Sequence, residues 1–102
     1  MKEVVKKIES PNNFVLRLFV AGASANSARA ISNIKSVCEL YLKDRYNLEI
    51  IDVYQQPLIA KEEQLIALPL LIKKNPLPGS RLVGDMSDLK KVLKGLGINE
   101  DI

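Results

Sequence analysis

The apolar positions in the first half of the chain predict a strand followed by a long helix. Residues 14–20 form an apolar run that only Arg17 interrupts. A run that is apolar on both faces is typical of a central strand in a parallel or mixed sheet. We therefore expect Arg17 to lie near a sheet end or to reach outward along its stem.

A turn of small residues, 21–25, separates this strand from the helix, and Ser24 and Asn26 are both suitable N-caps. Beyond the turn, apolar residues recur at spacings of three and four, which predicts one buried helix face. That face contains Ala28, Ile31, Ile34, Cys38 and Tyr41. Charged residues 43–45 end the pattern, and Asn47 is the expected C-terminal residue of the helix.

A second strand is predicted over residues 48–54, and a helix of this length between two strands implies a crossover with parallel pairing. Pro57 then breaks the strand, and residues 58–68 predict a short helix. Its apolar side contains Leu58, Leu65 and Ile66. The Glu62 and Glu63 carboxylates lie on the other side, and we expect a solvated face there, because no histidine or nucleophile accompanies them.

The remainder of the chain predicts a hairpin and a last helix. Residues 70–72 and 81–83 are short strand-forming runs separated by a segment rich in proline and glycine. Asp85 or Ser87 is suited to cap the last helix. Its apolar face contains Met86, Leu89, Val92, Leu93 and Leu96. The element order is therefore β-α-β-α-β-β-α, which predicts an α/β, thioredoxin-like fold with a β-α-β N-terminal half.

The turn after the first strand is where a thioredoxin-like oxidoreductase would hold a Cys-x-x-Cys pair. Here the turn contains Ser24 but no cysteine, and the single cysteine, Cys38, lies on the buried helix face as a small core residue. The chain contains no histidine, no glycine-rich phosphate loop and no base beside a serine. We therefore expect no enzymatic activity, no cofactor and no metal site, and we expect a binding or regulatory protein.

Composition and charge set the broad class. The 102 residues are 47% hydrophobic and 26% charged, which suits one globular domain over residues 14–97 with a flexible arm, 1–13, and a short tail, 98–102. No apolar run could span a bilayer and no secretion signal is evident, so we expect a cytoplasmic protein without membrane contact. The net charge of +3 is small and the aromatic residues do not alternate with basic ones, which argues against nucleic-acid binding.

Several motifs together resemble the KaiB family of circadian-clock proteins. They are the Leu-x-Val-Ala-Gly turn with Asn26, Ser27 and Arg29, the segment from Asp52 to Pro57 with Ala60, the segment from Ala67 to Leu71, and Gly84-Asp85 before the last helix. The resemblance extends from Phe14 to about Leu96.

The resemblance implies a regulator that binds the ring of a KaiC-type ATPase, in a circadian clock or in related stress or timing regulation. It also implies that the half after Pro57 switches between two packings, a thioredoxin-like one and one that assembles as a homodimer or homotetramer. KaiA and a SasA-like kinase pathway are further partners that it suggests. Glu49 stands where a lysine is common in the family, which argues against KaiA binding.

The resemblance also singles out five residues. Asn26 and Arg29, at the start of the first helix, and the basic residues Lys73 and Arg81 are candidate partner contacts, and Gly95 is a candidate fold-switch position. The alternative interpretation is a stand-alone thioredoxin-like sensor or adaptor that resembles the SasA input domain and binds another signalling partner. A thiol or peroxide enzyme that uses Cys38 is a third hypothesis, which the lone cysteine disfavours.

Overall fold

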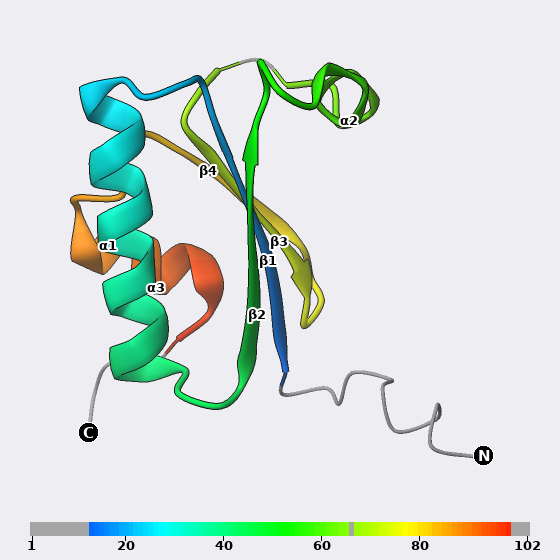
Figure 1. The fold of residues 1–102 in the computed structure, drawn as a ribbon. Coiled ribbons are helices and arrows are strands. Elements are labelled where there is room, and N and C mark those ends of the chain that lie inside the picture. The colour runs from blue at the N-terminus through cyan, green and yellow to red at the C-terminus, as the bar shows by residue number, and fades with distance from the viewer. Residues whose placement is uncertain (1–12, 66, 99–102) are drawn as a thin grey trace.

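Four strands form one mixed sheet in the order β2-β1-β3-β4, with three helices packed against it (Figure 1). The computed structural model describes residues 13–65 and 67–98. The elements are β1 (Phe14–Val20), α1 (Ala25–Tyr41), β2 (Tyr46–Asp52), α2 (Pro57–Glu62), β3 (Leu70–Asn75), β4 (Ser80–Val83) and α3 (Leu89–Leu96). The predicted arm up to residue 12, the tail from residue 99 and Ile66 lie outside the described residues.

The central strand is β1, as its apolar run predicted. It pairs in parallel with β2 and antiparallel with β3, and β3 pairs antiparallel with β4. The predicted β-α-β unit and the hairpin are therefore confirmed. The arrangement is the thioredoxin-like one expected from the element order.

The two faces of the sheet are covered differently. The helices α1 and α3 lie on one face, called here the inner face, and α2 lies on the other, called the outer face, beyond one end of the strands (Figure 1). Alternate residues of β1, including Leu16 and Leu18, enter the larger core with α1 and α3. Phe19 points to the outer face and forms a smaller core with residues of β2 and β3, against which Ile59 of α2 packs.

The start of α1 follows the prediction, and its end does not. Ser24 is the N-cap, because its Oγ accepts from the Ser27 backbone N–H at 3.1 Å. The helix ends at Tyr41 with Leu42 as its C-cap, and Asn47 lies in β2 instead. The chain reverses through Asp44, whose φ of 64° is left-handed, and the carbonyl of Arg45 already accepts from the Phe14 backbone N–H. This early pairing with β1 is what ends the helix.

The structure also corrects the boundaries of β2 and α2. The strand covers 46–52 instead of 48–54, because Asp52 begins a turn in which its Oδ1 accepts from the Tyr54 backbone N–H at 2.9 Å. The helix α2 ends at Glu62 instead of continuing to residue 68, and Gln64 then adopts a left-handed φ of 54°. The ends of β2 and α2 depend on turn geometry and not on the spacing of apolar residues, so the apolar pattern did not predict them.

The last helix begins later than predicted. Its N-cap is Asp88, whose Oδ1 accepts from the Lys91 backbone N–H at 3.2 Å, and neither Asp85 nor Ser87 has this role. Met86 belongs to the preceding loop, with a left-handed φ of 64°, although its side chain is buried in the core. Val92, Leu93 and Leu96 of the predicted apolar face are buried as well, but Leu89 is 44% exposed. Burial therefore followed the apolar pattern only in part, and the helix boundary followed the capping carboxylate.

Candidate partner-binding surface

The turn between β1 and α1 uses its hydroxyl groups for local structure. Ser27 is buried, and its Oγ accepts hydrogen bonds from the Ala21 backbone N–H at 3.2 Å and from the Ser24 hydroxyl at 2.9 Å. The Ser24 hydroxyl also caps α1. These contacts explain why small hydroxyl residues occur at this turn, and they leave neither hydroxyl beside a base that could activate it.

The single thiol is remote from this turn and unreactive. Cys38 is fully buried in the core with α1, and burial, with a further contribution from the Glu39 carboxylate, raises the pKa of its thiol to about 12. A thiol with so high a pKa carries almost no thiolate near neutral pH. The prediction that Cys38 is a core residue is confirmed.

A second set of contacts joins the ends of β1 and β2. Asp52 Oδ1 accepts from the backbone N–H of Gly22 at 3.1 Å as well as from that of Tyr54. Gly22 has a left-handed φ of 64°, and a Cβ at this position would lie 3.3 Å from the Tyr54 ring. Glycine is therefore needed here for both the turn and the ring.

The Tyr54 ring leads into an exposed apolar groove beside α2. The groove has a volume of about 510 Å3, and Val53, Tyr54, Pro57, Ala60, Lys61, Gln64, Leu65 and Leu68 line it. The side chains of Tyr54 and of neighbouring Leu58 are each 75% exposed. The sequence pattern predicted Leu58 on the apolar side of a helix that continued to residue 68, and this surface was therefore not predicted. Pro57 begins α2, and the apolar pattern carried no signal that the helix ends as early as Glu62.

Asn26 and Arg29, the first two candidate contacts, lie together at the start of α1. Arg29 Nη2 donates to Asn26 Oδ1, and Arg29 Nε donates to Asp85 Oδ2 at 3.0 Å. The Arg29 side chain remains 54% exposed, so its guanidinium is available at the surface. Hydrogen bonds from Ser87 and from Arg29 lower the pKa of Asp85. The loop after β4 is thereby held against α1 by a pair of residues 56 apart in sequence.

The candidate Arg81 lies elsewhere, on the outer face of the sheet. It is exposed, and its Nη2 donates to the Glu63 backbone carbonyl at 3.1 Å.

The Glu63 carboxylate itself accepts from Arg17 at 3.1 Å and from Lys74 at 3.0 Å. Its side chain is only 16% exposed, so the expectation of a solvated Glu62–Glu63 face is wrong for Glu63. Arg17 lies in the middle of β1, not at a sheet end, and it reaches outward to this carboxylate and to Glu49.

Lys73, the remaining basic candidate, points into the molecule. Lys73 is only 6% exposed, and its Nζ donates to the Leu96 carbonyl at 3.2 Å. The ammonium therefore satisfies a carbonyl at the end of α3, where the helix dipole favours a cation. In this packing Lys73 supports α3, and its side chain is not presented at the surface.

The candidate Gly95 faces β4 from α3. A Cβ at this position would lie 2.5 Å from Leu82 Cδ2, and the Gly95 carbonyl accepts from the Ser80 hydroxyl at 2.7 Å. A side chain there would displace Leu82 or separate α3 from β4. The position is thus sensitive to size in this packing.

Neither a metal site nor a membrane span is evident in the part of the chain that the structure describes. Within residues 13–65 and 67–98, no group of three or more cysteine or acidic side chains is placed to hold a metal ion. Likewise, none of the helices described is long and apolar enough to cross a membrane.

Comparison with solved structures places the fold among thioredoxin-like proteins. The germline thioredoxin Deadhead of Drosophila melanogaster superposes with a TM-score of 0.67 at 17% identity, over 91% of this chain and 90% of the other. The N-terminal domain of SasA from Synechococcus elongatus gives a TM-score of 0.66 at 23% identity, over 89% and 90% of the two chains. At these identities the likeness concerns the fold alone.

The sequence comparisons define the family. The model of the KaiB domain matches residues 17–98. Circadian clock protein KaiB3 of Synechocystis is 51% identical over 85% of each chain. Circadian clock oscillator protein KaiB of Synechococcus elongatus is 42% identical over 83% of each chain. The chain belongs to the KaiB family, and the resemblance noted in its motifs is confirmed.

Proposed function

We propose that this chain is a non-enzymatic regulatory protein that binds the ring of a KaiC-type ATPase, in a circadian clock or in related timing or stress regulation. The supporting observation is its relationship to circadian clock proteins across most of its length. The engaged hydroxyls of Ser24 and Ser27 and the high pKa of Cys38 are consistent with a role in binding.

The surface most suited to this role lies around the start of α1 and α2. The exposed guanidinium of Arg29, positioned by Asn26 and Asp85, offers directional charge. The groove beside α2, with exposed Tyr54 and Leu58, offers the apolar area that a protein interface needs. The Tyr54 ring lies beside Gly22, so the groove adjoins the turn before α1. Arg81 on the outer face remains a further candidate contact.

The direct test is complex formation with the KaiC-type ATPase of the same host, measured by native mass spectrometry and size-exclusion chromatography with and without ATP. Incubation must be long, because a rarely populated binding-competent state lowers the apparent affinity. We expect a complex that depends on the nucleotide. Failure to observe any complex after prolonged incubation would refute the proposal.

Variants at Arg29 distinguish a direct contact with the partner from a role in holding the structure together. Arg29→Glu should weaken the complex by about tenfold or more, whereas Lys35→Glu, at an exposed lysine of the same helix, should change affinity less than about twofold. The exchange Arg29→Asp with Asp85→Arg keeps an internal ion pair but inverts the charge at the surface. If Arg29 contacts the partner, this double variant stays defective, and restored binding would assign Arg29 a structural role only.

The second candidate function is an adaptor that resembles the SasA input domain, which the fold likeness to that domain favours. In that case the chain would bind a signalling partner and would not bind the ATPase ring. A pull-down from the host that captures a kinase but no KaiC-type ATPase would favour it.

Three further predictions remain: KaiA binding, homodimer or homotetramer formation, and a second packing of the half after Pro57. Mass measurement of the free chain and of its complexes will test them.

A further inference from the structure

Among the strands that the structure describes, one edge of β4 has no neighbouring strand. In the sheet order, β4 has β3 on one side only. Gly84, opposite Pro69, donates its backbone N–H to that residue's carbonyl at 2.9 Å. Because hydrogen-bonded pairs alternate along antiparallel strands, Ser80 and Leu82 also face β3. The backbone N–H and C=O groups of Arg81 and Val83 therefore point away from the sheet.

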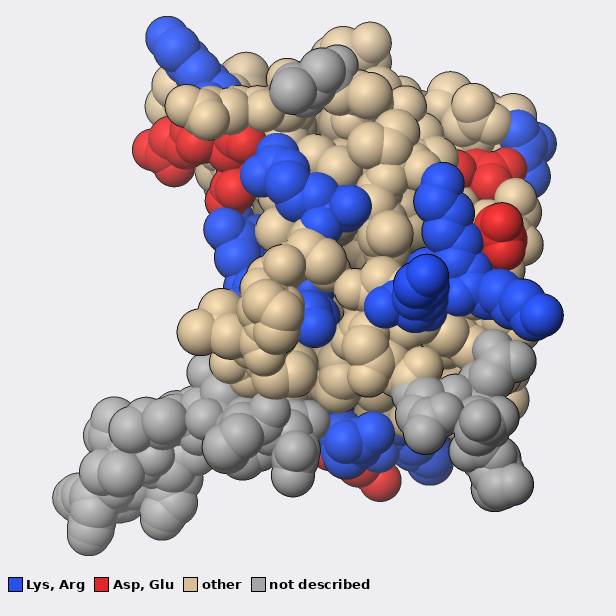
Figure 2. Space-filling view, turned by 180° about the vertical axis from the view of Figure 1, so that it is seen from behind, with Lys and Arg blue, Asp and Glu red and all other residues tan. Residues whose placement is uncertain are grey.

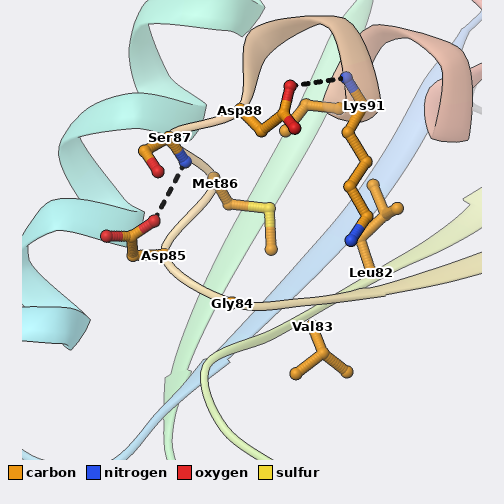
Figure 3. Close-up of a pocket in the computed structure, with 9 residues that line it drawn as sticks. Leu82, Val83, Gly84, Asp85, Met86, Ser87, Asp88 and Lys91 are labelled. Atoms are coloured by element: carbon orange, nitrogen blue, oxygen red, sulfur yellow. Dashed lines mark hydrogen bonds between the residues drawn. The ribbon is translucent and has the colours of Figure 1, made fainter.

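The two sides of this edge differ in shape. Between β4, the following loop and α3 lies a recess of about 120 Å3, lined by Leu82, Val83, Gly84, Asp85, Met86, Ser87, Asp88, Lys91 and Val92. Figure 3 shows the Lys91 side chain running from α3 towards Leu82, with Val83 on the other side of the strand. Val83 is 56% exposed. An added strand would meet a recess lined by both apolar and charged side chains on one side and an exposed valine on the other.

Both cations and carboxylates lie beside the edge, since Arg81 belongs to β4 and the recess is lined by Lys91, Asp85 and Asp88. Arg81, on the strand, and Lys90, Lys91 and Lys94, on α3, are exposed and form no ion pair within residues 13–65 and 67–98. Asp85 pairs with Arg29, whereas Asp88 caps α3 and keeps its negative charge, so the four cations exceed the single unpaired carboxylate near the edge. Figure 2 shows Lys and Arg side chains on both sides of an uncharged strip on one face of the molecule, with Asp and Glu side chains beyond them and further Lys and Arg at the margins.

We propose that the edge of β4 binds an extended acidic segment of a partner protein as a fifth strand. Backbone pairing with Arg81 and Val83 would supply affinity. Carboxylates on adjacent residues, which point to opposite sides of a strand, would reach Arg81 on one side and Lys91 on the other, and a small apolar side chain would enter the recess. This site adjoins the surface around Arg29 through Asp85, but the proposal does not rest on binding to a KaiC-type ATPase.

Charge decides among the possible occupants. A second copy of this chain would bring its own Arg81 and Lys91 against the same residues, and like charges oppose that pairing. Nucleic acid would need stacking surfaces for its bases, and the residues that line the recess include no aromatic ring. An acidic extended peptide would pair with the backbone groups of Arg81 and Val83 that point away from β3 and would also meet the cations.

The test uses a short capped peptide with the repeat Val-Glu-Glu-Val, which places glutamate and valine on both sides of the strand, titrated into the 15N-labelled full chain. We expect chemical-shift changes centred on the amides of Arg81 and Val83 and slower hydrogen exchange at both. Lys91→Glu should weaken binding by about tenfold, while the matched change Lys35→Glu on α1 should leave it within about twofold. Raising the salt concentration should also weaken binding.

Two control peptides make the result decisive without altering the protein. Replacing glutamate by lysine in the peptide should abolish binding, and N-methylation of its backbone should do so while retaining its charge. The proposal is overturned if the N-methylated peptide binds equally well, if the shifts occur at another part of the molecule, or if a single-stranded oligonucleotide binds the same amides more tightly than the peptide. These outcomes are independent of any complex with the ATPase ring.

Discussion

Arg17 and Glu63 connect the middle of the central strand to the residue that follows α2, with Arg17 Nη1 donating to Glu63 Oε2 at 3.1 Å. Lys74 of β3 donates to the same carboxylate oxygen. The helix α2 has only six residues, none of them fully buried, so it gains little stability from its own packing. The shared carboxylate therefore has a large part in holding α2 on the outer face.

Removing this carboxylate charge should loosen α2. We expect Glu63→Gln to lower the free energy of unfolding by about 1–2 kcal/mol, because two charge-assisted hydrogen bonds to a mostly buried group are weakened. Urea denaturation measures the loss, and hydrogen exchange should locate it at residues 57–63. Glu62→Gln is the matched control, since Glu62 is exposed and has no ion pair within the described residues. An equal loss in both variants would contradict this account.

The same carboxylate predicts how stability depends on pH. Lys74, through its hydrogen bond and its charge, and Arg17 lower the pKa of Glu63 below its ordinary 4.5. A lowered folded-state pKa means that the stabilisation is complete above the unfolded-state pKa and is lost as pH falls through the folded-state value. Stability should therefore decrease below about pH 4.5, and Glu63→Gln should reduce that slope. Urea midpoints measured from pH 6 to pH 3 test this, and parallel curves for the two proteins would contradict it.

The contact between Gly95 and Leu82 predicts that changes at the two positions are coupled. Alanine is favoured over glycine in a helix by about 1 kcal/mol, but a Cβ at 95 meets Leu82 at 2.5 Å. We expect Gly95→Ala to be more favourable in a Leu82→Ala background than in the natural chain, by about 1 kcal/mol in a double-mutant cycle. NMR spectra of each variant would report any second packing. Strictly additive effects would show that this contact does not restrict position 95.

Burial of the thiol predicts slow chemistry at Cys38. A disulfide reagent such as DTNB should react with the folded chain only as fast as the chain opens, and within seconds in concentrated urea. The Cys38→Ser variant should retain binding to the ATPase ring if it folds. Disulfide-reductase or peroxidase activity that this substitution abolished would revive the hypothesis of a thiol enzyme.

Local patterns in the sequence were sufficient for much of the fold. The apolar run of residues 14–20, the three-and-four spacing after Ser24 and the proline and glycine breaks predicted all seven elements in their correct order. Ser24 was one of two residues expected to cap α1, and the position of Cys38 on the helix face predicted its burial. Each of these features depends on residues a few positions apart, which is the range over which periodicity and capping act.

The tertiary structure decided the contacts that carry the functional argument. Arg29 pairs with Asp85 across 56 positions and Arg17 with Glu63 across 46, and no local pattern specifies such partners. Lys73 was a candidate partner contact. In the structure, however, α3 ends beside it, and its ammonium donates to the Leu96 carbonyl inside the molecule. The sequence alone therefore determined which segments form strands and helices and much of the core, although Ala28, Leu58 and Leu89 of the predicted apolar faces are exposed. Which charged groups remain exposed was decided only when the sheet order brought distant segments together, because a charge is neutralised by its neighbours in space.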